Sequence, residues 1–277
     1  MVTSRRDYSA DAVAAAKSVL VELVHVLGEF REQIVVVGGW VPGLVLTEAR
    51  EPHIGTLDID LALDCQHLPD ASYATLLKTL TSRGYQQDPQ QPFRFFREVP
   101  IPDRPPIVVE VDLLAGEHGG TGHRTQPVQD ARARKARGCD LAFANPHTVT
   151  IEGELPGGGR LSVTCRVAAI VPWLVMKGMA LADRLKEKDA YDISYAVRVY
   201  PGGPARLAEE FRPHLEHALV REGLGKIRSE FRTPEDAGPD WVADFLAEVD
   251  PETRAILQRR VYEEVTAWLD PLGVGPW

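Results

Sequence analysis

The stretch VVVGGWVPGLVLTEAREPHIGTLDIDLALD, from Val35 to Asp64, places two aspartates inside a segment that otherwise has the pattern of a buried β-strand. Side chains alternate across a strand, so Asp58 and Asp60 point to one side and Ile59 points to the other. Aspartate is depleted in strands, and two like charges about 5 Å apart repel by roughly 3 kcal/mol at an effective dielectric constant of about 20. The pattern therefore requires either a solvated strand end or a cation that offsets the repulsion.

A third aspartate stands in a similar context. In VVEVDLL, Glu110 and Asp112 alternate with apolar residues and so share one face of a second strand. Carboxylates are hard oxygen ligands, which Mg²⁺ and Mn²⁺ prefer. If the two strands meet at one sheet edge, three aspartates can form a two-metal site that activates a hydroxyl and stabilises charge on phosphate oxygens. We therefore predict a divalent metal site at Asp58, Asp60 and Asp112.

Two adjacent glycines supply a complementary feature. Gly38 and Gly39 follow the apolar run QIVVV and precede a helix that is expected to begin near Pro42. Glycine lets backbone N–H groups approach an anion closely, and a helix N-terminus favours negative charge. The pair is thus a candidate nucleotide-phosphate site, although a tight strand-to-helix turn explains it equally well. We expect Trp40 to belong to the core.

The hydrophobic pattern predicts an α/β (α+β) protein, with a mixed sheet and flanking helices over 1–167 and a helical domain over 168–277. The expected strands are residues 33–37, 56–63, 93–99, 107–114, about 147–152 and 160–166. The expected helices are residues 8–29, 70–85 with Asp70 as N-cap, 172–185, 189–200, 204–211 and 251–269.

Composition excludes several classes of protein. The formal charge of −9 disfavours a protein that coats nucleic acid without specificity, although a local basic patch remains compatible with it. Three scattered cysteines without a CxxC pair argue against a disulfide framework and against a zinc site. No apolar run has the length of a membrane span, and the N-terminal residues lack the apolar core of a signal peptide. We expect a cytoplasmic protein with no membrane partner.

A second set of charged residues lies in the helical half. Lys177 stands in the strongly apolar run PWLVMKGMALADRL, and Arg184 follows two turns later on the same helix face. Such a lysine either extends to solvent or meets a buried anion. Two cations that point into a cleft would suit a triphosphate. Alternatively, these charged residues form a solvent-exposed helix face that is stabilised by the i,i+4 ion pair of Lys188 with Asp192.

These motifs together resemble a known family. GGW…TLDIDLAL resembles the first motif of the nucleotidyltransferase fold of the DNA polymerase β superfamily, and VEVDLL resembles its third carboxylate. VPWLVMKGMALADRLKEKDAYDISYAV resembles the K…R…KD-x-x-D block of AbiEii/AbiGii-type nucleotidyltransferase toxins. The resemblance covers residues 35 to about 200 in the same order. It implies a nucleotidyltransferase-like domain, an NTP substrate and a separately encoded antitoxin as partner.

In the resembled family, the lysine and the acidic pair of this block are linked to nucleotide binding and catalysis. The resemblance therefore implies nucleotide-binding roles for Lys177 and Lys188 and catalytic roles for Asp189 and Asp192. Which of the two aspartates is the functional acid stays open, because one of them would suit the cap of the following helix.

The leading hypothesis is a metal-dependent enzyme that moves a nucleoside monophosphate from an NTP to a hydroxyl, for which the resemblance suggests an RNA end. ARARKARG gathers four basic residues that would hold RNA phosphates or form a solvated charged face. These are Arg132, Arg134, Lys135 and Arg137.

Three alternatives remain. A small-molecule nucleotidyltransferase, such as one that modifies an antibiotic, would favour an acidic acceptor pocket. A catalytically inactive nucleotide-binding module is disfavoured because all three aspartates are present. A dinucleotide-binding oxidoreductase is disfavoured because the glycines fall as GGxxxG rather than GxGxxG, and because Asp60 and Asp112 would have no role in it.

Overall fold

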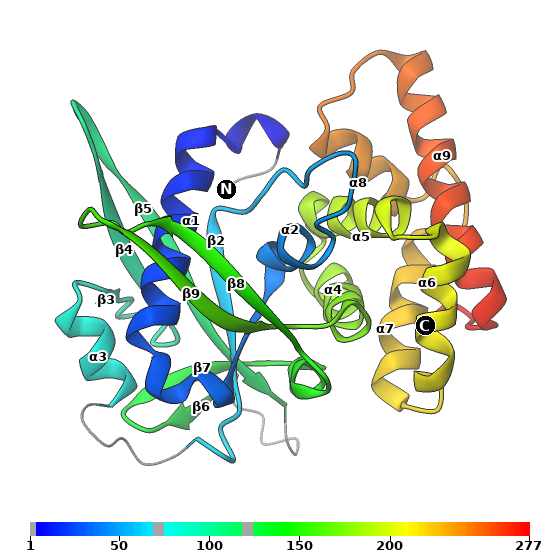
Figure 1. Cartoon of the computed structure of the whole chain (residues 1–277). Helices are drawn as coiled ribbons and strands as arrows, with labels where there is room; N and C mark the ends of the chain where they lie inside the picture. Colours follow the sequence, from blue (N-terminus) through cyan, green and yellow to red (C-terminus); the bar gives the residue numbers. More distant parts are fainter. Residues whose placement is uncertain (1–3, 69–74, 118–123) are drawn as a thin grey trace. The chain divides into compact units, whose positions relative to one another are not determined.

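The computed structural model of the 277-residue chain describes residues 4–68, 75–117 and 124–277 (Figure 1). The predicted cap residue Asp70 lies outside the described residues. No helix among the described residues is long and apolar enough to cross a membrane.

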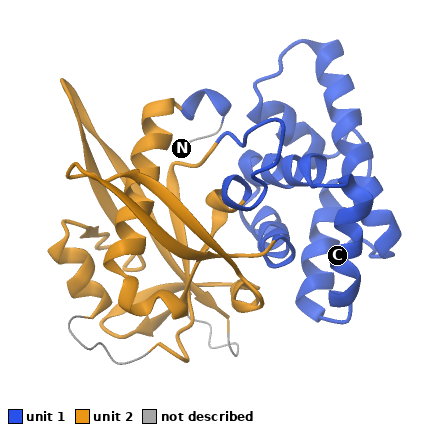
Figure 2. Cartoon of the chain, in the orientation of Figure 1, with its two compact units in different colours: residues 1–8, 42–54, 170–277 blue, residues 9–41, 55–169 orange. Residues whose placement is uncertain are grey.

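The chain divides into two compact units, coloured separately in Figure 2. Unit 1 consists of residues 1–8, 42–54 and 170–277, and unit 2 consists of residues 9–41 and 55–169. The main boundary, between Ala169 and Ile170, lies two residues beyond the boundary expected from the sequence. The two N-terminal segments of unit 1 were expected in the α/β half, because hydrophobic periodicity gives no sign of which unit such a short segment joins.

Unit 2 is built on a mixed sheet, which over the described residues has nine strands in the order β3-β4-β5-β2-β1-β9-β8, with β7 beside β5 and β6 beside β7. The strands are β1 (Ile34–Val37), β2 (Asp58–Leu63), β3 (Gln86–Gln87), β4 (Arg94–Ile101), β5 (Arg104–Gly116), β6 (Thr125–Val128), β7 (Ala131–Ala136), β8 (His147–Glu154) and β9 (Arg160–Val167). β2 is antiparallel to β1 and parallel to β5. The mixed sheet and the C-terminal helices confirm the predicted fold class.

One face of this sheet packs against helix α1 (Ala10–Val26), which crosses several strands (Figure 1). Ser9 caps the helix, since its hydroxyl oxygen accepts a hydrogen bond from the backbone N–H of Ala12 at 3.2 Å. On the sheet, Ile59 and Leu61 are fully buried. Because side chains alternate along β2, Asp58 and Asp60 lie on the face opposite these two core residues.

Unit 1 is helical. Its helices are α4 (Ile170–Arg184), α5 (Glu187–Val199), α6 (Gly203–Phe211), α7 (Ala218–Glu230), α8 (Ala237–Phe245) and α9 (Pro251–Leu269), and α2 (Val41–Val45) stands where the chain crosses into this unit. α4 and α7 approach so closely that a Cβ atom built on Gly178 would lie 2.3 Å from the carbonyl oxygen of Gly223. The apolar stripe predicted on residues 251–269 is buried, with Val265 and Trp268 fully enclosed.

Several elements were absent from the sequence prediction. β7 was interpreted as a charged segment, but its small residues Ala131 and Ala133 are buried and alternate with Arg132 and Arg134, which gives the alternation of a strand. Helices α7 and α8 were not predicted. The helix expected over 70–85 is described only from Leu76 to Ser82 (α3).

Candidate active site

The paired aspartates lie on β2, between β1 and β5. Asp58 is exposed and Asp60 is half-buried. The indole Nε1–H of the buried Trp40 donates a hydrogen bond to the backbone oxygen of Asp58 at 3.1 Å. The hydroxyl of Thr56, a buried residue, donates to Oδ1 of Asp58. These two contacts fix the start of the strand, so the carboxylate of Asp58 is oriented by its neighbours.

Strand register brings the third aspartate to the same face. In the parallel pair of β2 and β5, Asp58 lies opposite Glu110 and Asp60 lies opposite Asp112. Neighbouring strands are about 4.8 Å apart, and residues paired in register point to the same side of the sheet. We call these four residues the acidic face. Asp112 is its most buried member, with 5% of its surface exposed.

The Gly38-Gly39 turn contacts this face directly. Gly38 has a φ of +67°, and a Cβ atom placed on it would lie 2.0 Å from Oδ2 of Asp60. A Cβ atom on Gly39 would lie 2.5 Å from Oγ1 of Thr56. Glycine is therefore favoured at Gly38 by Asp60 of the acidic face and at Gly39 by Thr56 beside it. The helix that follows the turn, α2, has only five residues, so its dipole adds little to an anion site.

Arginines from two neighbouring strands reach the acidic face. Arg94 of β4 lies opposite Asp112 in the register and donates to both of its carboxylate oxygens, at 2.8 and 3.0 Å. Its Nη2 atom also lies 2.7 Å from Oε1 of Glu110. Arg134 of β7 approaches Asp112 more loosely, at 3.9 Å. Neither arginine contact was predicted; the register of β4 beside β5 is the signal that would have found Arg94.

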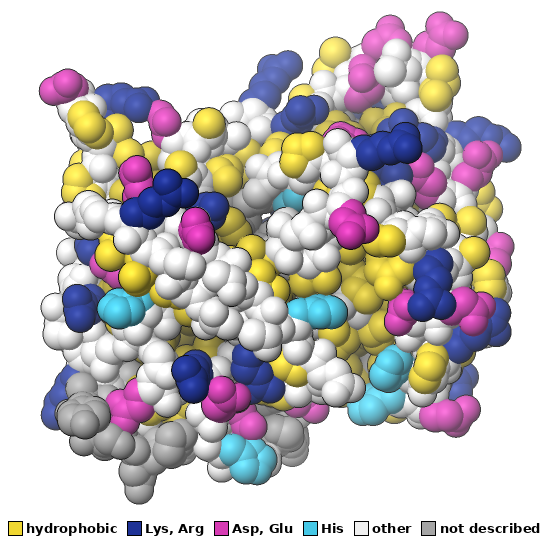
Figure 3. Space-filling view, in the orientation of Figure 1, with side chains coloured by type: hydrophobic (Ala, Val, Ile, Leu, Met, Phe, Trp, Pro, Cys, Tyr) yellow, Lys and Arg dark blue, Asp and Glu magenta, His cyan; other side chains and the backbone are white. Residues whose placement is uncertain are grey.

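The four basic residues of ARARKARG do not act as one group. Arg134 faces Asp112 and lies over the ring of Phe93, at 5.5 Å from the ring centre. The Arg132 Nε–H donates to Oγ1 of Thr125 at 3.1 Å. On the face that Figure 3 presents, basic and acidic side chains lie next to one another, without an extended basic patch.

The remaining members of that run are Lys135 and Arg137. Lys135 points to the side of β7 opposite Arg134, since side chains alternate along a strand. Arg137 follows the strand, and its Nη1 atom lies 3.9 Å from Glu117. The strand thus divides the run between two faces.

The second predicted group forms a buried cluster within unit 1. Lys177 on α4 is 5% exposed, and its Nζ atom lies 2.7 Å from Oδ1 of Asp189 and 2.7 Å from Oδ2 of Asp192, both on α5. Arg184 donates to both oxygens of Asp189, at 2.8 and 3.0 Å. Lys188 pairs with Asp192 one turn away. Both aspartates are therefore held by cations of the chain itself.

His53 belongs to this cluster and was missed in the sequence. Its ring Nε2 lies 2.9 Å from Oδ1 of Asp192, and its side chain is 1% exposed. It lies in the segment 42–54, where Tyr195 donates to the backbone oxygen of Glu51 at 2.7 Å and Arg198 pairs with the Glu51 carboxylate at 3.2 Å. No spacing in the sequence links His53 to α5, so only the tertiary structure could identify it. We call His53, Lys177, Arg184, Lys188, Asp189 and Asp192 the buried cluster.

The electrostatics of the buried cluster follow from its burial and its pairing. Burial, and then the charge of Lys188, lower the pKa of His53 to about 4. Burial alone would raise the pKa of Asp192, but Lys177 and Lys188 outweigh it and hold that pKa well below its ordinary value. The pKa of Asp189 is lowered in the same way, by Lys177 and Arg184. His53 is thus neutral near pH 7 and donates its Nε2–H to a charged Asp192.

The described residues hold no group of three or more His, Cys, Asp or Glu side chains in the arrangement of a metal site. The carboxylates of Asp58 and Asp60 nevertheless have the donor chemistry that a hard divalent cation requires. Asp112 differs, since Arg94 already binds both of its oxygens. The metal site predicted at Asp58, Asp60 and Asp112 therefore stays a prediction, with Asp112 already paired with Arg94 in this arrangement.

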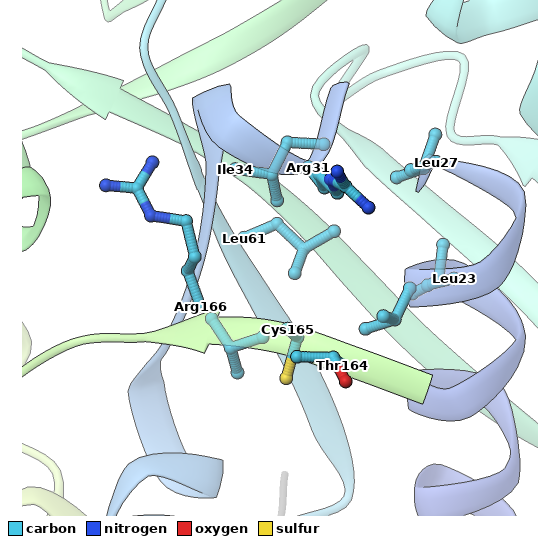
Figure 4. Close-up of a pocket in the computed structure, with 10 residues that line it drawn as sticks. Leu23, Leu27, Arg31, Ile34, Leu61, Thr164, Cys165 and Arg166 are labelled. Carbon is cyan, nitrogen blue, oxygen red and sulfur yellow. The ribbon is translucent and has the colours of Figure 1, made fainter. Parts of the chain in front are cut away.

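A hollow of about 320 Å³, including space open to solvent, lies on the other side of the sheet (Figure 4). Leu23 and Leu27 of α1, Leu61 of β2 and Cys165 of β9 line it. Burial raises the pKa of the Cys165 thiol to about 11, so this thiol is not a ready nucleophile. Because Leu61 points away from the acidic face, the hollow is separate from it.

Comparison with protein-family models, curated proteins and solved structures found no match to this chain. The geometry of the two charged groups is therefore the basis for a functional proposal.

Proposed function

We propose that the chain is a metal-dependent nucleotidyltransferase that moves a nucleoside monophosphate from an NTP to a hydroxyl acceptor. The observation that carries the proposal is the register that sets Asp60 beside Asp112, with Gly38 against the carboxylate of Asp60. A glycine turn, a D-x-D strand and a third carboxylate on the adjacent strand are the parts that the sequence resemblance requires, in the order it requires them.

In the proposed reaction, the acceptor oxygen attacks the α-phosphorus of the NTP, and a new P–O bond forms. The bond from this phosphorus to the bridging oxygen breaks, pyrophosphate leaves, and the hydroxyl gives its proton to a carboxylate of the acidic face. Asp58 and Asp60 would hold a Mg²⁺ or Mn²⁺ ion, which supplies charge stabilisation to the phosphate oxygens. Thr56 and Trp40 orient Asp58 for this role.

Within this proposal, the buried cluster supports the fold of unit 1. Lys177, Asp189 and Asp192 are enclosed and paired with one another, which leaves little capacity to bind a triphosphate. Arg184 is the member with the most exposed side chain, at 38%. It is therefore the best remaining nucleotide ligand among the predicted cations of this unit.

The acceptor class is the open part of the proposal. An RNA end agrees with the toxin-like resemblance and implies an antitoxin as partner; a small molecule agrees with the division of the basic run of β7 between two faces. An inactive module is favoured by one observation, the ion pair that Arg94 makes with Asp112.

The test is to incubate the pure protein with each of the four labelled NTPs, Mg²⁺ and either total RNA or a panel of small hydroxyl compounds. We expect label to move to one acceptor class. Asp60→Asn should abolish transfer while the free energy of unfolding holds or rises, because the change removes one charge from a repelling pair. Absence of transfer with every NTP and acceptor would refute the proposed function.

A further inference from the structure

The strand β8 lies at one end of the sheet of unit 2 (Figure 1). Among the described residues it pairs with β9 and with no other strand, so one of its edges is open. The register with β9 runs without a break from His147 opposite Val167 to Glu154 opposite Arg160. An open edge of this length is a surface on which a further strand can pair through backbone hydrogen bonds.

The hydrogen bonding of the β8–β9 hairpin shows which residues of β8 face its open edge. The N–H of Leu155 donates to the backbone oxygen of Gly159 at 2.8 Å, so these two residues form a hydrogen-bonded pair. Such pairs alternate with non-hydrogen-bonded pairs along an antiparallel ladder. The Oγ1 atoms of Thr150 and Thr164 lie 3.2 Å apart, as close side chains of a non-hydrogen-bonded pair do. The residues whose N–H and C=O groups point outward are therefore the exposed Thr148, Thr150, Glu152 and Glu154.

The open edge of β8 differs from the edge at the β3–β4 end of the sheet. Natural sheets block unwanted pairing with proline, lysine, bulges or a covering segment. At the β3–β4 end, β3 covers part of β4, Pro100 stands within β4, and the register with β5 shifts after Val99. β8 contains neither proline nor lysine, and its register has no shift. The edge of β8 therefore lacks these blocking features.

β8 is complementary to a second copy of itself in the antiparallel orientation. When Ile151 of one copy lies opposite Ile151 of the other, Thr150 faces Glu152 and Thr148 faces Glu154. The outward-pointing residues of each copy then meet outward-pointing residues of the other, so their N–H and C=O groups can all pair. No two like charges lie directly opposite each other in this register.

The neighbouring registers fit less well, and Glu152 and Glu154 are the reason. A shift by one residue would set outward-pointing groups opposite inward-pointing ones, so only steps of two need comparison. One such step places Glu152 opposite Glu152 of the second copy, where like charges repel. The opposite step places Glu154 opposite Pro146, which has no N–H to donate. The two glutamates thus select one register.

Arginines of β9 make the charges of this register complementary. Arg160 lies opposite Glu154, and Arg166 lies opposite Thr148. Across the two copies, one row therefore reads Arg160 and Glu154 of one chain, then Thr148 and Arg166 of the second copy. Glu154 is flanked by an arginine of its own chain and, beyond a small threonine, by an arginine of the other. Opposite charges across paired strands stabilise the pairing.

We propose that the open edge of β8 is a homodimer interface, at which two copies of the chain join their sheets through antiparallel β8 strands. Such a contact is isologous, because each copy offers the same residues to the other. One strand from each copy makes a contact smaller than a standard interface of about 1,600 Å². The dimer is therefore expected to dissociate on dilution. This inference does not depend on the proposed nucleotide transfer.

Sedimentation velocity of the full chain over a wide range of protein concentration tests the interface. We expect the wild type to pass from monomer to dimer as its concentration rises. Thr150→Pro removes an outward-pointing N–H and no hydrogen bond to β9, so it should raise the dimer dissociation constant by at least about tenfold.

Glu98→Pro is the matched control on the other edge strand. The N–H of Leu113 donates to the backbone oxygen of Phe93 at 2.9 Å, so the same alternation directs the N–H of Glu98 away from β5. β3 pairs with β4 only as far as Phe96. Glu98→Pro therefore makes an equivalent change at an edge outside the proposed interface and should leave the dissociation constant unchanged.

Disulfide cross-linking tests the register with exposed residues alone. Thr150 and Glu152 of the two copies should have Cα atoms about 5.5 Å apart, within the range of a disulfide. A mixture of Thr150→Cys and Glu152→Cys chains should therefore give a cross-linked dimer on oxidation. A mixture of Thr148→Cys and Glu152→Cys is the control and should give only the background of the wild type, because these positions are not opposite each other.

A wild type that stays monomeric at every concentration would overturn the interface. So would a dimer that a folded Thr150→Pro variant retains at wild-type strength, or one that Glu98→Pro abolishes. If Thr150→Pro does not fold, the cross-linking experiment decides the matter. Absence of the Thr150–Glu152 cross-link, or an equal yield in the control mixture, would overturn the proposed pairing.

Discussion

The acidic face of unit 2 and the buried cluster of unit 1 both place charged residues among apolar ones, yet they handle the charge differently. In the buried cluster, Asp189 and Asp192 are each bound by two cations. Lys188 pairs with Asp192, and its Nζ atom also stands 5.4–5.8 Å from the ring centres of Tyr8, Tyr191 and Phe245. Its charges are therefore satisfied within the unit.

In the acidic face, Arg94 binds Asp112 and Glu110, whereas Asp58 at the edge of the face is exposed. An exposed carboxylate is accessible to a cation from solvent, whereas an enclosed and paired one stabilises its own fold. The difference assigns the chemistry of the proposed function to the acidic face. It assigns the conformation of unit 1 to the buried cluster, although both groups have the same kind of sequence signature.

The largest effect should follow removal of the central cation of the buried cluster. Lys177→Met leaves two buried carboxylates without their shared partner, which should lower the free energy of unfolding by about 3–5 kcal/mol. Arg184→Met is the control, because its side chain is 38% exposed and its loss should cost much less. Urea denaturation measures both. A loss below about 1 kcal/mol in Lys177→Met would contradict the structural role of the cluster.

The next effect concerns pH and His53, which faces Asp192, Lys188 and Lys177. Its pKa of about 4 lies below the unfolded value near 6.5, so between these values only the unfolded state binds the proton. The wild type should therefore lose up to about 3 kcal/mol of stability from this residue as the pH falls from 6.5 to 4. The His53→Phe variant has no group at this position that binds a proton, so it does not lose this stability. The difference between its free energy of unfolding and that of the wild type should therefore become smaller as the pH falls from 6.5 to 4.

Tyr195→Phe is the control for His53. It removes the hydrogen bond to the oxygen of Glu51 in the same segment without removing a group that titrates in this range, so it should cost about 1 kcal/mol at every pH from 4 to 6.5. A deficit of His53→Phe that stays constant or widens with acid would show that His53 is not held neutral.

A smaller effect should come from the glycine turn at the acidic face. Gly38→Ala places a Cβ atom against Asp60 at a φ of +67°, which should cost about 1–3 kcal/mol and displace the carboxylate. The structure leaves open space around Gly28, so Gly28→Ala is the matched control within the same unit. Thermal unfolding measures the loss of stability, and the affinity for Mn²⁺ measures the displacement of the Asp60 carboxylate. An unchanged Mn²⁺ affinity in Gly38→Ala would mean that the turn does not position Asp60.

The smallest expected effect concerns the basic residues of β7. Arg134 contacts Asp112 of the acidic face, so Arg132→Gln and Arg137→Gln together test an RNA path without disturbing that face. If RNA is the acceptor, its binding should weaken and the salt slope should fall by nearly one unit for each lost phosphate contact. An unchanged slope, measured by RNA binding across a salt series, would favour the small-molecule acceptor.

Period-2 alternation allowed the sequence to predict the fold class and the strands β2 and β5. It also predicted that Asp58 and Asp60 share a face, because this follows from strand geometry alone. It could not show that Arg94 stands beside Asp112, since that contact depends on the register between strands distant in sequence. β7 was missed because Arg132 and Arg134 alternate there with small buried alanines instead of large apolar residues, so the period-2 hydrophobic pattern is weak.

The buried cluster shows the same limit. The spacing of Lys177, Arg184, Lys188 and Asp192 indicated that these residues share helix faces, but not whether those faces meet solvent, substrate or each other. That outcome is decided by the packing of α4 against α5 and by the segment that carries His53. Local pattern therefore locates charged groups, and tertiary pairing determines which of them remain available.

The central claim is that the acidic face is an available cation site, and the stabilisation of the protein by Mn²⁺ tests it most directly. At a concentration one hundred times the dissociation constant, a cation that binds only the folded state adds about 2.7 kcal/mol to the free energy of unfolding. We expect this increase in the wild type and its loss in Asp60→Asn, which removes one of the two ligands. An equal increase in both proteins, or no increase in the wild type, would contradict the claim.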